Sequence, residues 1–374
     1  MMKVLIVGGN GLIGGAIAKA SADAGRDVYV VGRSVPADAS SKVHYIQGNW
    51  YEDAFAADAI KDGFDVIVDA LVFNEEQMRR TARIVDGHCK QLIYISTDSV
   101  YEHPASDLSE DQPICDENVK WKYGIDKRKA ELYLQMHGGE YSFSWTIIRP
   151  TVTFGLTRIP VGFAGKRNTF DLCARMLADK PIIRFDDPKT KHAMCHDSIF
   201  GAAVDALFMN ESAFGKAYHI SDDEAYTYGE VFEAIEKALG CEGKFVFLPA
   251  DVLKKDYPEL YEDMIYDKNP EFTLDNSAIK SVCPDVSFHV ELGDVIFKTV
   301  EALKKNKREG SDISEYDLIT DHLLLENPDG AGEYLSTLDE EYKGKIRSFV
   351  KMEKNNRARQ RVRETLRSIK KRIV

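Results

Sequence analysis

The first patterned stretch of the chain is residues 3–20, KVLIVGGNGLIGGAIAKA. It starts with a short, mostly apolar run of β-formers, which is the pattern of a parallel strand buried on both faces. Glycines interrupt the run at once, and helix formers follow from Ala16. The stretch therefore predicts a strand, a glycine turn and a helix, in that order.

The glycines of this turn have the spacing of a phosphate site. Gly8, Gly11 and Gly14 fit GxxGxxG, while Gly9, Gly11 and Gly14 fit GxGxxG equally well. Residues without a Cβ allow the backbone to approach a diphosphate, and the free N–H groups and positive dipole end of the new helix would face it. We expect a dinucleotide here. A glycine-rich turn without a ligand is the alternative, which the strand-to-helix context disfavours.

The composition is that of a soluble globular enzyme. The 374 residues are 44% hydrophobic and 29% charged. The longest apolar runs are of strand length, and the N-terminus enters the first predicted strand without a signal peptide, so we expect a cytoplasmic protein. No CxxC pair occurs among the six cysteines, which we expect to be reduced and mostly buried: Cys89, Cys115, Cys173, Cys195, Cys241 and Cys283.

Charge is distributed unevenly along the chain. The net charge is −12, yet residues 351–374 hold ten Lys or Arg against Glu353 and Glu364, a net of +8 that leaves −20 for residues 1–350. An acidic body repels nucleic acid, and only the tail could attract it. We therefore expect no nucleic-acid partner.

Strand-like runs recur along the first half of the chain, at residues 28–31, 43–46, 66–68, 92–95 and 146–148. Helical patterns occupy most of the gaps, as in residues 75–86 and 125–136. Alternating β and α units of this kind build an α/β fold, a Rossmann-type doubly wound parallel sheet whose ligands lie outside the carboxyl ends of the strands.

The end of the second predicted strand indicates which cofactor is used. An acidic residue there would hydrogen-bond the adenosine ribose of NAD, but the sequence has Gly32-Arg33-Ser34, a cation and a hydroxyl where a 2′-phosphate would lie. This favours NADP over NAD. The alternative is that Arg33 is a solvated loop charge.

Tyr123 and Lys127 are candidates for proton transfer. Their spacing of four residues on a predicted helix puts both side chains on one face. A nearby ammonium favours the phenolate, as an acid/base tyrosine at neutral pH requires. Thr97 follows another predicted strand, and its hydroxyl would hydrogen-bond the substrate oxygen whose proton Tyr123 transfers.

With these residues in place, the sequence resembles the extended short-chain dehydrogenase/reductases, the NAD(P)-dependent epimerase/dehydratase family that works largely on nucleotide sugars. The resemblance covers roughly residues 3–305. It rests on the glycine turn and on segments that match family motifs: Ser96–Tyr101, Tyr123-Gly124-x-x-Lys127, Arg149–Gly155, His196-Asp197 and Tyr218–Ser221.

The resemblance implies a role for each site residue. Tyr123 would transfer the proton, Lys127 would also hold the nicotinamide ribose, and Thr97 would be the third catalytic residue. The cofactor would contact residues along the predicted carboxyl edge of the sheet: Gly8, Gly11, Leu12, Ile13, Gly14, Arg33, Ser34, Ala70, Lys127, Pro150 and Thr151.

Two departures from the family pattern narrow the reaction. Sugar-nucleotide dehydratases tend to carry Thr-Asp-Glu where this chain has Thr97-Asp98-Ser99, which disfavours dehydration and leaves epimerisation or ketone reduction ahead. Epimerases tend to have a diphosphate-binding arginine where this chain has His192, although Lys189 and Lys191 could compensate.

Other charged residues carry weaker indications. His192 and His196 are four residues apart, but no third ligand has a suitable spacing, so we expect no metal site. Several polar residues are candidate anion contacts, none favoured individually: Arg158, Lys166, Arg167, Asn168 and Arg184.

We expect three regions. Residues 1–155 would form the dinucleotide-binding domain, to which 189–225 returns, and 156–303 would form mainly a smaller mixed α/β substrate lobe. Residues 304–374 would be a helical extension with a solvated linker at 304–310, helices at 313–325 and 338–352, and a basic tail.

The tail has an amphipathic pattern that leaves two interpretations open. Val362, Leu366, Ile369 and Ile373 line one helical face among basic residues, as in a helix that lies on a membrane surface or binds a protein partner. The alternative is packing on the protein's own body or on a second subunit.

Two functions follow as hypotheses. The first is a nucleotide-sugar 4-epimerase or ketoreductase that transfers hydride at a sugar carbinol or keto carbon, and that we expect to be a homodimer. The second is a non-catalytic nucleotide- or RNA-binding protein on the same fold. The intact Tyr123, Lys127 and Thr97, together with the acidic body, favour the enzyme.

Overall fold

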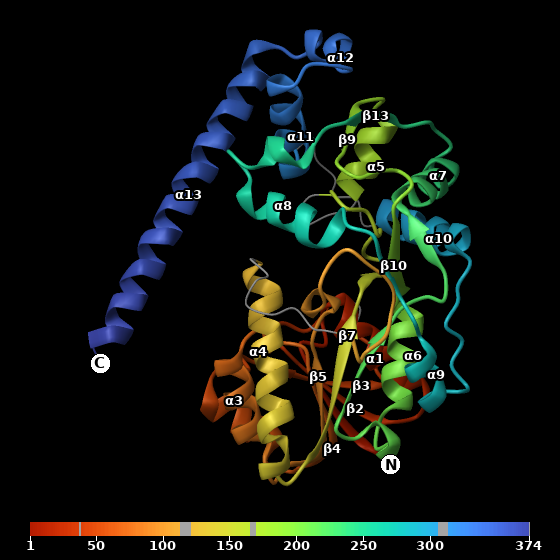
Figure 1. Ribbon diagram of the computed structural model, residues 1–374, viewed down its shortest axis with the longest axis vertical. Helices are drawn as coiled ribbons and strands as arrows, with labels where there is room; N and C mark the ends of the chain where they lie inside the picture. The colour runs from red at the N-terminus through yellow and green to blue at the C-terminus, as the bar shows by residue number, and fades with distance from the viewer. Residues whose placement is uncertain (37–38, 113–120, 165–169, 306–312, 374) are drawn as a thin grey trace. The chain divides into compact units, whose positions relative to one another are not determined.

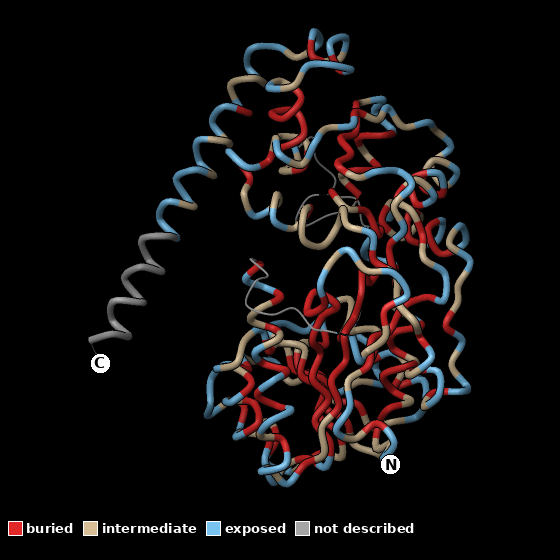
Figure 2. The backbone as a smooth tube through the Cα atoms, in the orientation of Figure 1, coloured by how far each residue is buried: buried red, intermediate tan, exposed pale blue. Residues whose placement is uncertain are grey.

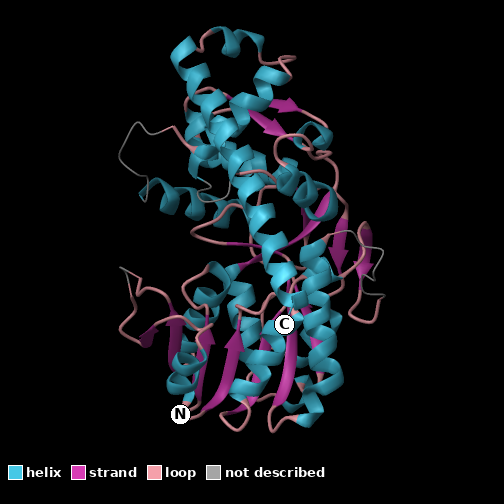
Figure 3. Ribbon diagram, turned by 90° about the vertical axis from the view of Figure 1, so that its left-hand side faces the viewer, coloured by secondary structure: helices cyan, strands magenta, loops and turns pink. Residues whose placement is uncertain are grey.

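The computed structural model describes residues 1–36, 39–112, 121–164, 170–305 and 313–373, with side chains as far as residue 360. Its main sheet has seven parallel strands (Figure 3), in the spatial order β11 (Lys216–Ile220), β7 (Ser144–Pro150), β5 (Cys89–Ile95), β4 (Phe64–Asp69), β1 (Lys3–Val7), β2 (Asp27–Gly32) and β3 (Val43–Gln47). The predicted doubly wound sheet is confirmed.

Helices cover both faces of this sheet (Figure 1). Successive side chains of a strand point to opposite faces, so Val4 and Ile6 belong to one apolar cluster and Leu5 and Val7 to another. Most strands of the sheet are accordingly buried along much of their length (Figure 2), whereas the edge strand β3 has no fully buried residue. The first cluster includes residues of α1 (Leu12–Asp23), α6 (Asp197–Ala206) and α9 (Ser277–Val282), and the second includes residues of α2 (Asp53–Ile60), α3 (Glu75–Val85) and α4 (Lys122–His137).

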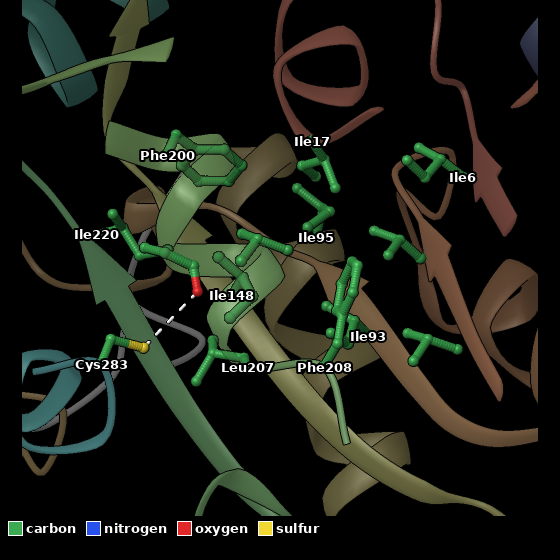
Figure 4. Packing of buried hydrophobic residues seen from close by; sticks show 14 of the residues in the cluster. Ile6, Ile17, Ile93, Ile95, Ile148, Phe200, Leu207, Phe208, Ile220 and Cys283 are labelled. Carbon is green, nitrogen blue, oxygen red and sulfur yellow. Dashed lines mark hydrogen bonds between the residues drawn. The ribbon is translucent and has the colours of Figure 1, made fainter. Parts of the chain in front are cut away.

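The first cluster joins segments that are far apart in the sequence (Figure 4). Ile6, Ile93 and Ile148 of the sheet lie in the same cluster as Phe200 of α6. Cys283, just after α9, belongs to it too, and its Sγ lies 3.7 Å from the carbonyl oxygen of Ala203, to which the thiol donates. Residue 283 thereby ties the middle of the 270–299 segment to the core of the main sheet.

The strand order changes direction between β1 and β4. From β1 the chain continues to β2 and β3 on one side, and β4, β5 and β7 follow on the other. In such sheets a crevice opens outside the carboxyl ends of the strands at this point. The glycine turn after β1 and the segment after β4 both begin there.

A second sheet contains β12 (Ala225–Thr227), β10 (Lys191–His196), β14 (Phe272–Leu274) and β6 (Ala105–Leu108), with β8 (Val152–Phe154) paired to β10. Short helical turns follow β5, α4 and α6 in the sequence: η1 (Asp98–Val100), η2 (Gly138–Glu140) and η3 (Glu211–Ala213), respectively.

The chain divides into two compact units. The first comprises Met1–Pro160, Pro188–Val231 and Pro270–Thr299, and the second comprises Val161–Asp187, Phe232–Asn269 and Val300–Val374. Residues 270–299 thus fall in the first unit, although the sequence placed them in the substrate lobe, and the C-terminal extension is part of the second unit rather than a separate region. The functional roles given to these ranges stay predictions.

The second unit holds a small parallel pair of strands and most of the C-terminal helices. Helices α7 (Tyr228–Leu239) and α10 (Leu292–Lys305) cross the boundary between the units. The remaining elements are β9 (Pro181–Arg184), β13 (Lys244–Phe247), α5 (Phe170–Leu177), η4 (Ala250–Leu253), α8 (Pro258–Asp263), η5 (Met264–Lys268), α11 (Glu315–Glu326), α12 (Gly332–Ser336) and α13 (Glu340–Ile373).

A buried charge cluster ties the extension to the rest of the second unit. Arg175 of α5 donates to Asp317 (2.7 Å) and to Asp321, both on α11. Tyr334 and Tyr342 also donate to Asp321, at 3.0 and 2.7 Å. The helices predicted after residue 312 therefore form and pack, whereas the linker predicted at 304–310 lies mostly outside the described residues.

The basic tail continues α13, a helix of 34 residues. Lys354 pairs with the buried carboxylate of Asp256 at 2.8 Å, and the other side chains from 351 to 360 are exposed or only half-buried. Val362, Leu366, Ile369 and Ile373 lie beyond the described side chains. Among the helices described, none combines the length and apolar character needed to cross a bilayer.

Candidate functional site

The glycine turn between β1 and α1 is tight because of the protein's own packing. Gly8 has φ +84°, in the left-handed region that disfavours other residues. A Cβ on Gly14 would lie 2.5 Å from the carbonyl oxygen of Gly8, and a Cβ on Gly9 would lie 2.7 Å from the side chain of Val30. These three glycines are therefore explained without a ligand.

Gly11 is different. It is the exposed N-cap of α1, and a Cβ there would make only an ordinary contact, 3.7 Å from the carbonyl oxygen of Gly8. Leu12 and Ile13 begin the helix behind it, and Gly11, as its N-cap, has no side chain that could cap the first N–H groups. The exposed tip of the turn, Asn10 and Gly11, and the N–H groups at the start of α1 fit a dinucleotide diphosphate.

The end of β2 is held against this turn. The Asn10 side chain donates to the carbonyl oxygen of Ser34, and Gln47 Nε2 donates to that of Arg33 at 3.2 Å. The side chains of Arg33 and Ser34 are exposed. Ala70, after β4, is half-buried, and its N–H donates to the carbonyl oxygen of Val7 at 3.1 Å.

Helix α4 begins close to η1, the short helical turn that follows β5. Gly124 lies in its first turn, where any Cβ would collide with the carbonyl oxygen of Ser99. The neighbouring Tyr123 is 39% exposed, and its ring centroid lies 5.3 Å from that of Trp121. The glycine after the tyrosine thus permits the approach that brings α4 to the Thr97–Ser99 segment.

Lys127 lies one turn further along α4 and is 2% exposed. Its Nζ donates to the carbonyl oxygens of Val72 (2.7 Å) and Ile95 (2.9 Å), and it lies 4.8 Å from the Phe73 ring centroid. Two of three ammonium protons are therefore held by backbone at the carboxyl ends of β4 and β5, which orients the third.

Burial lowers the pKa of Lys127 to about 7, and the charges of Asp69 and Glu131 oppose this lowering. Asp69 is itself buried, and it accepts from Leu71 N, Trp50 Nε1 and Thr81 Oγ1. A buried ammonium near neutral pKa is the kind of perturbed group that marks functional sites.

The hydroxyl of Thr97 lies in a polar segment at the end of β5. Its Oγ1 accepts from Ser99 N at 3.2 Å and is 2.9 Å from Ser99 Oγ. Pro150 and Thr151 are buried at the end of β7, and Thr151 Oγ1 is buried without a hydrogen-bond partner among the described residues. A buried hydroxyl without a partner beside the proposed nicotinamide site could hydrogen-bond the carboxamide of a bound nicotinamide.

The structure brings the predicted catalytic and cofactor residues to one edge of the main sheet. The glycine turn, Ala70, Thr97 and Thr151 follow the carboxyl ends of β1, β4, β5 and β7. Sequence reasoning missed the buried partners beneath them, Glu131 and Arg149. Glu131 could have been found, because it continues the four-residue spacing of Tyr123 and Lys127.

The candidate anion contacts, and His192 at the position of the family's diphosphate-binding arginine, have different surroundings. His192 is 2% exposed and stacks on Tyr228 with ring centroids 4.4 Å apart. Arg184 is 5% exposed and pairs with Asp186. Arg158 is exposed. Lys166, Arg167 and Asn168 lie outside the described residues.

His196 caps a helix in this structure. Its Nδ1 accepts from Ser198 N (3.3 Å) at the start of α6. Within the described ranges, no three or more His, Cys, Asp or Glu side chains gather in a way that could hold a metal ion. All five described cysteines are free, and Cys89, Cys173, Cys195 and Cys283 are buried.

Solved structures share this fold. A UDP-glucuronic acid 4-epimerase from Bacillus cereus, solved with UDP-glucuronic acid and NAD, is 17% identical with a TM-score of 0.65, and the match covers 82% of this chain and 100% of that one. An epimerase from Methanothermobacter thermautotrophicus is 14% identical with a TM-score of 0.66, covering 82% and 93%.

Sequence comparison adds a relative and a family. A 2′-dehydrokanamycin reductase from Streptomyces kanamyceticus is 22% identical over 255 residues, which are 67% of this chain and 70% of the reductase. The model of the NAD dependent epimerase/dehydratase family matches residues 4–198, more than half of the chain. The fold, the glycine turn and this match together show that the chain belongs to the NAD dependent epimerase/dehydratase family.

Proposed function

We propose that the protein is a nicotinamide-dinucleotide-dependent oxidoreductase that transfers hydride at a carbinol or keto carbon of a nucleotide sugar, as a 4-epimerase or a ketoreductase. The observation that carries this proposal is the buried Lys127. Its ammonium is held by two backbone carbonyls, one helical turn from Tyr123, at the carboxyl edge that also bears the glycine turn.

The glycine turn, Arg33, Ser34, Ala70, Pro150 and Thr151 would hold the cofactor. When bound, its nicotinamide accepts and returns the hydride. The N–H groups at the start of α1 would face the diphosphate. Arg33 would pair with a 2′-phosphate, so the proposed cofactor is NADP, with NAD as the weaker ligand.

The protein's own residues would move the proton. The Tyr123 phenolate would take the carbinol proton as hydride leaves, and the charge of Lys127 would stabilise that phenolate. The Thr97 hydroxyl would hydrogen-bond the same substrate oxygen. The absence of a glutamate beside Asp98 leaves no second carboxylic acid in this segment for dehydration.

The solved epimerase supports the substrate class, and the two comparisons together do not choose the reaction. The solved epimerase described above binds UDP-glucuronic acid, whereas the curated relative is a reductase. A panel of 4-keto and 4-hydroxy nucleotide sugars, with dinucleotide absorbance followed, separates net reduction from redox-neutral epimerisation. An absence of turnover across the panel would favour the non-catalytic binding protein.

The cofactor proposal predicts that NADP(H) binds more tightly than NAD(H) and that Arg33→Ala narrows the difference. One charge-assisted phosphate contact contributes roughly 1.5–3 kcal/mol, which is a ten- to hundred-fold change in affinity. Fluorescence titration of both cofactors measures this.

Arg83→Ala is the matched control, because Arg83 is an exposed arginine of α3 that pairs with Asp53 at 3.1 Å. It should leave both affinities unchanged. Equal affinities in the wild type, or a preference for NAD(H), would refute the NADP proposal.

Of the two interpretations of the basic tail, we propose attachment to an anionic surface through the end of α13, which predicts salt-sensitive binding to anionic vesicles. Deleting residues 361–374 removes six basic residues and Glu364 but keeps Lys354, which pairs with Asp256. Basic residues near an anionic surface contribute about 1 kcal/mol each. Vesicle sedimentation should therefore show binding by the full chain and none by the truncated one.

Neutral vesicles are the control, and neither protein should sediment with them. If the truncated protein instead unfolds, or if it loses the homodimer that we propose, then the tail belongs to the body of the protein. Sizing chromatography and thermal melts of both proteins distinguish these outcomes.

A further inference from the structure

Arg149 joins three segments of the candidate site from beneath. It is the penultimate residue of β7, just before Pro150, and is 1% exposed. Its Nε and Nη2 donate to the two carboxylate oxygens of Glu131 on α4, at 3.1 and 2.9 Å, and its Nη1 donates to the hydroxyl of Tyr101 at 2.8 Å. Tyr101 ends the segment that starts at Thr97.

The chain of hydrogen bonds continues from Tyr101 to His219 and Asp275, and the donor and acceptor of each bond can be assigned. Burial lowers the pKa of His219 to about 4, so its ring is neutral near pH 7. Its Nε2 lies 2.8 Å from the carbonyl oxygen of Asp275, which can only accept, so Nε2 carries the proton. Nδ1 must then accept from the Tyr101 hydroxyl at 3.1 Å, which leaves the Tyr101 oxygen to accept from Arg149.

This directed chain fixes how α4 is placed. Tyr123, Lys127 and Glu131 follow at intervals of four residues and lie on one face of the helix. A bidentate contact between Arg149 and the fully buried Glu131 resists both rotation and sliding of α4. We propose that Arg149 is a positioning residue that sets α4 against the ends of β5 and β7, and so places Tyr123 and Lys127 for proton transfer.

A purely stabilising role would not require these charges. Two ions lose hydration when they are buried, and replacing a buried pair by apolar residues of similar size is often neutral for stability. Positioning is a separate matter, because a misplacement of about 1 Å can cost about 10²-fold in rate. The two roles can therefore be separated by removing both charges together.

The decisive variant is the double substitution Glu131→Leu with Arg149→Met. We expect it to fold with a melting temperature close to that of the wild type, to lose about 10- to 100-fold in kcat, and to bind cofactor more weakly, because Lys127 would hold the nicotinamide ribose. Tyr101→Phe, which removes only the hydroxyl that links Arg149 to His219, should lower kcat by a smaller factor. Arg26→Met is the matched control, since Arg26 pairs with Asp205 at the amino end of β2, and it should leave kcat unchanged.

Hydrogen exchange gives a readout that does not depend on turnover. Exchange in residues 122–131 should quicken in the double variant and stay unchanged in Arg26→Met. This inference rests on the proposed function, and the two can fail separately. Wild-type inactivity on every substrate would overturn the proposed function, whereas a double variant with normal kcat, or with normal exchange in α4, would overturn the role of Arg149.

Discussion

Replacing Tyr123 by phenylalanine is expected to lower turnover by at least ~10²-fold and to leave cofactor affinity unchanged. The substitution keeps the ring that packs near Trp121 and removes the oxygen that would take the carbinol proton. Hydride can leave a carbinol carbon only as that proton is removed. Steady-state kinetics on an accepted substrate, together with cofactor titration, measures both quantities.

Two further variants test the roles proposed for Lys127 and Thr97 beside Tyr123. Lys127→Met should reduce both turnover and cofactor affinity, because the ammonium would stabilise the phenolate and hold the nicotinamide ribose. Thr97→Ala should cost less, since losing one neutral hydrogen bond removes about 0.5–1.5 kcal/mol. Near wild-type turnover in Tyr123→Phe would contradict the proposed mechanism.

Replacing Asp321 by asparagine should destabilise the second unit by about 3–5 kcal/mol. Asp321 is fully buried, and it accepts from Arg175, Tyr334 and Tyr342. The neutral side chain leaves the buried Arg175 guanidinium with Asp317 as its charged partner. The NH₂ group of the asparagine also replaces a carboxylate oxygen that accepts hydrogen bonds, so that it faces hydrogen-bond donors. The three tryptophans, Trp50, Trp121 and Trp145, all lie in the first unit, so the loss is measured by urea unfolding followed by circular dichroism, with tryptophan fluorescence reporting the first unit separately.

Asp251→Asn is the matched control in the same unit. Asp251 pairs with Lys254 at 2.9 Å, but its side chain is 68% exposed, and such pairs contribute about 0.2–1 kcal/mol. A similar loss in both variants would show that the Arg175 cluster does not hold the extension in place. Loss in Asp321→Asn alone would show that residues 313–345 are an integral part of the second unit.

The sequence alone was sufficient where neighbours along the chain decide the outcome. The apolar run at residues 3–7 and the glycines after it predicted β1, the turn and α1, because strand and helix periods are local properties. The spacing of Tyr123 and Lys127 likewise predicted that they share a face of α4. These patterns were enough to identify the doubly wound sheet and the family to which it belongs.

Only the tertiary structure decided which charges are buried and what they contact. The exposed Lys122 and the buried Lys127 lie in the first turns of the same helix, and nothing in the local pattern shows that Lys127 donates to the carbonyl oxygens of Val72 and Ile95. Arg175 donates to Asp321 and Tyr101 donates to His219, and each of these two partners lies more than a hundred residues away in the sequence. Whether a charge is buried depends on how distant segments pack. The attraction between two buried charges also arises only once these segments have packed. The positions of the catalytic candidates were therefore readable from the sequence, while the network that holds them was not.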